Sequence, residues 1–119
     1  MKKVPQENVE AFRRAIPQAE GVSIKKMFGC EAGFFNGNMF CGTFESTMIV
    51  RLDEAGRVAA KKKGYSPFEP MGRPMKEYVC VPEGKETEIA FLNGVFQEGL
   101  AYARTLPAKA AKKKSSKKA

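Results

Sequence analysis

The chain has 119 residues, of which 43% are hydrophobic and 29% are charged. This length allows one hydrophobic core, and the composition is ordinary for a folded domain, which excludes a wholly disordered protein. No apolar run approaches the roughly 20 residues that cross a bilayer, so no membrane-spanning helix and no membrane partner are expected.

The net charge of +8 is concentrated at one end of the chain. Between Pro107 and Ala119 there is no acidic residue, and the rest of the chain carries 15 basic against 13 acidic residues. We therefore predict a folded domain over residues 1–106 and a disordered, lysine-rich tail over residues 107–119. The lysines of this tail are Lys109, Lys112, Lys113, Lys114, Lys117 and Lys118.

Three cysteines, Cys30, Cys41 and Cys80, form an odd set without CxxC spacing, and no export leader is recognisable. These features favour a reducing cytoplasm, with no metal and no other cofactor. The chain also lacks histidine, the usual acid–base residue near neutral pH. Cys30 lies near Lys25 and Lys26, but no base is recognisable that would activate it, so an enzyme is only a minority hypothesis.

The first half of the chain predicts a helix followed by strands. Apolar residues recur at helical spacing between Pro5 and Pro17, and residues 23–52 are rich in aromatic and β-branched residues. Asn36-Gly37 predicts a type I′ hairpin turn, and Glu45-Ser46 predicts a second turn. A three-stranded meander follows from these signals.

The second half predicts a helix, a shaped loop, a strand and a long helix. Asp53 is a candidate N-cap for a helix over residues 54–63, and Gly64 suits the left-handed position after it. Residues 65–75 contain three prolines and predict a loop, followed by a strand over residues 76–81. The long helix is expected over about residues 85–106.

This long helix carries a second apolar stripe, formed by Phe91, Val95 and Tyr102. One interpretation is an interface for a protein partner or a homodimer, and the alternative is that both stripes of the helix belong to one core. Gly94 and Gly99 weaken the helix and are expected where a neighbouring backbone comes close.

These residues resemble the amino-terminal domain family of TfoX, the bacterial regulator of competence genes. The resemblance begins at Lys26-Met27-Phe28-Gly29, runs through Asn36–Gly42 and Met48–Arg51, and resumes at Gly72-Arg73-Pro74-Met75 and Ala103–Pro107. It implies an α+β fold, a two-layer α/β sandwich in the order α-β-β-β-α-β-β-α with an antiparallel sheet covered by helices, similar to secretion chaperones. It also implies a short strand near Ser66–Glu69.

The resemblance identifies the domain better than its function, because the competence regulator has a second, carboxy-terminal domain that is replaced here by the tail. We expect a non-enzymatic regulatory module that acts through contacts with a protein partner. Arg73, with Lys25 and Lys26, is a candidate contact for an anion or a partner. The tail lysines predict non-specific tethering to DNA or RNA, and hence association with the nucleoid, while an idle solubilising tail is the alternative.

Overall fold

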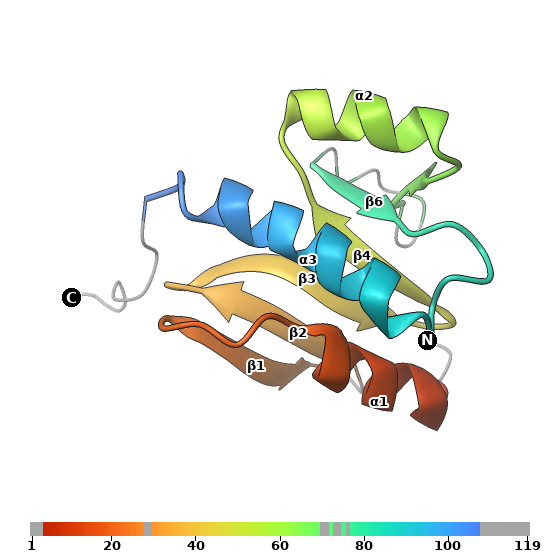
Figure 1. The fold of residues 1–119 in the computed structure, drawn as a ribbon, viewed down its shortest axis with the longest axis horizontal. Helices are drawn as coiled ribbons and strands as arrows, with labels where there is room; N and C mark the ends of the chain where they lie inside the picture. The colour runs from red at the N-terminus through yellow and green to blue at the C-terminus, as the bar shows by residue number, and fades with distance from the viewer. Residues whose placement is uncertain (1–3, 28–29, 70–71, 73–74, 76, 108–119) are drawn as a thin grey trace.

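The computed structural model describes residues 4–27, 30–69, 72, 75 and 77–107. Within these ranges the chain forms three helices and a six-stranded antiparallel sheet with the strand order β1-β2-β3-β4-β6-β5. Helices α1 and α3 cover one face of the sheet, and α2 stands apart from them over β6 (Figure 1). This confirms the predicted two-layer α+β arrangement. The elements are α1 (Gln6–Ala15), β1 (Val22–Met27), β2 (Cys30–Phe35), β3 (Asn38–Phe44), β4 (Thr47–Arg51), α2 (Glu54–Lys62), β5 (Ser66–Pro67), β6 (Tyr78–Cys80) and α3 (Ile89–Ala103).

The hairpin between β2 and β3 forms where Asn36-Gly37 predicts it. Asn36 has φ 50° and Gly37 has φ 86°, the two positive values that a type I′ turn requires. The turn between β3 and β4 likewise places Glu45 at φ 51°. Both predicted turns are therefore confirmed.

The prediction of a three-stranded meander is wrong, because four strands precede α2. β1 and β2 pair along their whole length, from Val22 opposite Phe35 to Met27 opposite Cys30. The sequence between them offers no Asn-Gly or proline signal, so the pattern did not show where one strand ends and the next begins. β1 forms one edge of the sheet.

The positions of α2 and of the short strands after it agree with what the neighbouring residues predict. The side chain of Asp53 accepts a hydrogen bond from the backbone N–H of Gly56 at 2.7 Å, and Gly64 has φ 96°. The strand implied near Ser66 exists as β5, although it has only two residues. β6 is shorter than the predicted strand over residues 76–81.

The long helix is also shorter than predicted, because residues 85–88 form turns and α3 begins at Ile89. Gly99 confirms the expected close approach. A Cβ atom there would lie 2.8 Å from Cγ2 of Val50 and 2.9 Å from the carbonyl oxygen of Phe40. At Gly94 the same expectation fails, since a Cβ would meet no atom of the described chain within 4 Å.

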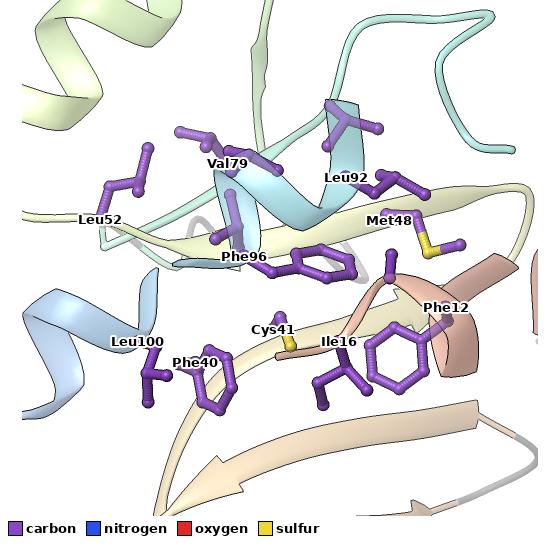
Figure 2. Close-up of a cluster of buried hydrophobic side chains, with 14 of the residues drawn as sticks. Phe12, Ile16, Phe40, Cys41, Met48, Leu52, Val79, Leu92, Phe96 and Leu100 are labelled. Atoms are coloured by element: carbon purple, nitrogen blue, oxygen red, sulfur yellow. The ribbon is translucent and has the colours of Figure 1, made fainter. Parts of the chain in front are cut away.

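The hydrophobic core fills the layer between the sheet and the helices α1 and α3 (Figure 2). Phe12 of α1 and Phe96 of α3 meet edge to face, with ring centroids 5.6 Å apart. A β-bulge shapes the floor of this core, because Gly33 pairs with Cys41 whereas Phe34 pairs with Met39. Phe40 is therefore the extra residue, and Phe40 and Cys41 are both fully buried in the core.

Candidate functional site

A polar cleft lies between the segment that follows α1 and one face of α3. Its volume is about 550 Å³. The polar side chains that line it are two arginines, Arg14 and Arg104, and three amides, Gln18, Asn93 and Gln97. We call it the α1–α3 cleft.

The amides on α3 fix the shape of this cleft. Nδ2 of Asn93 donates a hydrogen bond to the carbonyl oxygen of Ala15 at 2.8 Å, and thereby satisfies a carbonyl at the C-terminal end of α1. Nε2 of Gln97 donates to Oδ1 of Asn93 at 2.7 Å. The first bond holds α1 against α3, and the second orients the amide of Asn93, so both have a structural role.

The two arginines are exposed and suited to an anion. Neither Arg14 nor Arg104 forms an ion pair with any described residue. Arg13 differs, because its Nε donates to Oε1 of Glu31 at 2.9 Å, and this hydrogen bond holds the pKa of Glu31 below its usual value. The guanidinium of Arg104 lies 5.7 Å from the ring centroid of Phe35, which limits where its charge can move.

The predicted tail leaves the domain close to this cleft. Nδ2 of Asn38, a residue only 3% exposed, donates to the carbonyl oxygen of Pro107 at 2.8 Å. The chain is thus fixed three residues after Arg104, at the end of α3 that carries the arginine. The six tail lysines lie outside the described residues.

Of the residues predicted to contact an anion or a partner, Lys25 and Lys26 do not line the α1–α3 cleft. Lys25 and Lys26 lie on the edge strand β1 and are exposed. Nζ of Lys25 is 5.3 Å from the ring centroid of Phe34. Arg73 lies outside the described residues. Lys25 and Lys26 thus lie on one strand, outside the lining of that cleft.

The second apolar stripe of α3 lies mostly inside the domain. Val95 is 4% exposed and belongs to the core, so it offers no surface to a partner, and the interface expected there is wrong at this residue. Phe91 packs against the core beside Tyr65, at 6.1 Å between ring centroids. Tyr102 donates a hydrogen bond to Oε2 of Glu77 at 3.0 Å. The alternative of a single core fits Val95 and Phe91, whereas the half-buried Tyr102 binds a polar partner outside the core cluster.

The cysteines provide no recognisable reactive centre. Cys41 is fully buried, and its burial raises the pKa of the thiol well above the usual value. Burial also raises the pKa of the half-buried Cys80. Cys30 is half-buried. Among the described residues no three cysteine or carboxylate side chains cluster as metal ligands would.

Sequence reasoning missed the α1–α3 cleft because its two arginines lie far apart in the chain. Each had a local signal: Arg14 is on the polar side of the first predicted helix, and Arg104 is in one of the segments that resemble TfoX. No periodicity links the two positions, since their proximity depends on how α1 packs against α3.

Comparison with protein families settles the relationship of the domain. The TfoX N-terminal domain family matches residues 14–102 of the 119. The chain belongs to this family. No curated protein and no solved structure gives a significant match.

Membership of the TfoX N-terminal domain family supports a competence-related regulatory domain at most. The matched range begins at Arg14 and ends before Arg104 and the tail. The family match therefore does not account for the basic end of this chain. Among the described helices, none combines the length and hydrophobicity of a membrane span.

Proposed function

We propose that this TfoX N-terminal-like domain is a non-enzymatic regulatory binding module of the cytoplasm. Its folded part contacts a protein partner, and its basic end tethers it to DNA or RNA without reading sequence. The observation that supports the tether is the place where the tail starts. The bond between Asn38 and Pro107 fixes that place beside Arg104, close to the cleft that Arg14 also lines.

The physics of this basic end favours a polyanion. Exposed guanidinium groups bind phosphate oxygens, and each cation that neutralises a phosphate releases counterions. Additional lysines add affinity and speed of encounter, but they do not distinguish bases. Selectivity for a target therefore comes from the protein partner.

A salt titration tests the tether. The full chain is compared with a full-length variant in which all six tail lysines are replaced by glutamine, using a mixed-sequence DNA duplex as the probe. We expect the affinity of the native chain to fall steeply with salt, and that of the glutamine variant to be weak and nearly insensitive to salt. Equal binding by the two chains at every salt concentration contradicts the proposal.

The contribution of the α1–α3 cleft to DNA binding is measured separately. In the background of the native tail, Arg14→Gln and Arg104→Gln should each lower the salt slope by about one, as expected for one lost phosphate contact. Arg13→Gln is the matched control, because Arg13 is already paired with Glu31. If the control lowers the slope as much as the cleft variants, the effect comes from net charge and not from the cleft.

A further inference from the structure

A second hollow, apolar in character, lies between α2 and the strands β5 and β6. We call it the α2–β6 groove, and its volume is about 350 Å³. Phe68, Tyr78 and Val79 line it from the sheet side. Val58 of α2 and Met75 also line it. They are 53% and 40% exposed, which makes them two of the three large apolar side chains that are exposed in the described chain.

The groove stays open because α2 packs thinly on the domain. Ala60 is the one buried residue of α2. Lys61 follows Arg57 by four residues and Val58 by three, so both lie next to Lys61 on the helix surface, and this face lines the groove. Figure 1 shows α2 over β6, away from the other two helices.

The rim of the groove is basic. Neither Arg57 nor Lys61 forms an ion pair with a residue that the structure describes. Nη1 of Arg57 donates to the carbonyl oxygen of Leu52 at 2.7 Å, which fixes the side chain without neutralising it. Glu54 is the acidic residue among those lining the groove.

We propose that the α2–β6 groove docks a segment of a partner protein in which a bulky apolar side chain is flanked by Asp or Glu. This inference rests on the proposed function, which assigns the protein contacts to the folded domain. The apolar side chain covers Val58 and the aromatic floor, and the acids pair with Arg57 and Lys61. The positive charge of the rim disfavours two other occupants: a second copy would bring the same basic rim, and the tail is itself basic.

The size of the groove limits what it holds. Its volume is at the lower end of the range for small ligand sites, about 300–1,000 Å³, which leaves room for one or two side chains. A short segment therefore suffices, and its specificity comes from combining the apolar anchor with flanking charge.

The test uses full-length chains in which the six tail lysines are replaced by glutamine, so that the tail cannot capture acidic peptides. A display library of random twelve-residue segments is selected on this chain, and the selected segments are resynthesised as labelled peptides. We expect enrichment of Leu, Phe or Met next to Asp or Glu. Val58→Glu and Lys61→Glu should weaken the binding of these peptides by about tenfold or more, as expected for losing an apolar anchor or reversing a paired charge.

The matched controls make the same substitutions at exposed positions outside the groove, and they are Ile24→Glu on β1 and Lys62→Glu on α2. They should leave the affinity for the selected peptides within about twofold. Circular dichroism of all four variants confirms that each is folded.

Four outcomes overturn the inference. They are failure to select any peptide, enrichment of basic peptides, equal binding by Val58→Glu, and a concentration-dependent dimer in light scattering that Val58→Glu abolishes. If the basic end does not bind DNA, only the titration with the native tail would show it. The peptide experiment uses chains without the tail lysines, so each proposal can fail without the other.

Discussion

Tyr102, in the last turn of α3, donates its hydroxyl hydrogen to Oε2 of Glu77, which immediately precedes β6. Nε of Arg51 binds the other oxygen of the same carboxylate at 2.7 Å. The guanidinium of Arg51 also faces the rings of Tyr78 and Tyr102, at 5.8 and 5.6 Å from their centroids. One carboxylate thus connects α3, β4 and β6.

This connection predicts a loss of stability in acid. The hydrogen bond from Arg51 holds the pKa of Glu77 below its usual value of 4.5, and Arg13 has the same effect on the pKa of Glu31. Because the pKa is lower in the folded state, the stabilisation is complete above the unfolded value and disappears as the pH falls through the folded value. The free energy of unfolding should therefore decrease below about pH 4.5.

The pH dependence can be assigned to these two carboxylates by substitution. Glu31→Gln and Glu77→Gln should together lower the free energy of unfolding at pH 7 by about 1–2 kcal/mol and flatten its decline in acid. Urea denaturation from pH 3 to pH 7 measures both effects, and Glu20→Gln at an exposed position is the control. An unchanged acid profile in the double variant would show that other carboxylates dominate.

Substitution by alanine is expected to have opposite effects on stability at two glycines of α3. Gly99→Ala should destabilise the domain by about 1–3 kcal/mol, because the new methyl group collides with Val50 and with the backbone of Phe40. Gly94→Ala should stabilise it by up to about 1 kcal/mol, because alanine favours the helix and the space is open. Chemical denaturation of the two variants side by side checks the signs, and equal signs would contradict the packing described here.

Removing the N-cap of α2 is expected to destabilise this helix more than the rest of the domain. Asp53→Ala should remove about 1 kcal/mol of helix stability, whereas Asp53→Asn should keep most of it, because asparagine also accepts from the N–H of Gly56. Since α2 buries only Ala60, the change should appear as about fivefold faster hydrogen exchange of the amides of α2. Similar acceleration in both variants would argue against the cap.

The thiols should differ in reactivity in the order of their burial. Mass-spectrometric mapping of iodoacetamide labelling should find Cys41 unmodified in the folded protein, and Cys80 slower than a cysteine in an unstructured peptide, because burial raises both pKa values. Cys30 should react no faster than that peptide if the domain is not an enzyme. A markedly faster Cys30 would revive the minority hypothesis of a nucleophile.

Local signals in the sequence predicted the parts of this fold that depend on a few neighbouring residues. Asn36-Gly37 specified the hairpin through its backbone preferences, and Asp53 with Gly64 marked both ends of α2. The split between β1 and β2 left no comparable signal. The burial of Val95 could not be predicted from helical spacing either, because spacing shows that an apolar stripe exists but not what covers it.

The candidate sites were harder to predict than the fold, for the same physical reason. Arg14 and Arg104 line one cleft only because α1 and α3 pack side by side, and the α2–β6 groove exists only because α2 buries so little. Tertiary packing creates such surfaces, and it combines residues that no short motif contains.

The bulge at Phe40 has a consequence for how this domain varies in evolution. Deleting one neighbour of the bulge from β3, such as Met39, would pair the strands without the bulge, and Phe40 and Cys41 would then face opposite sides of the sheet. Insertions and deletions in this stretch should therefore be rarer among relatives than exchanges of one apolar residue for another. At the apolar positions of β3, we therefore expect the number of residues to be kept more strictly than their identity.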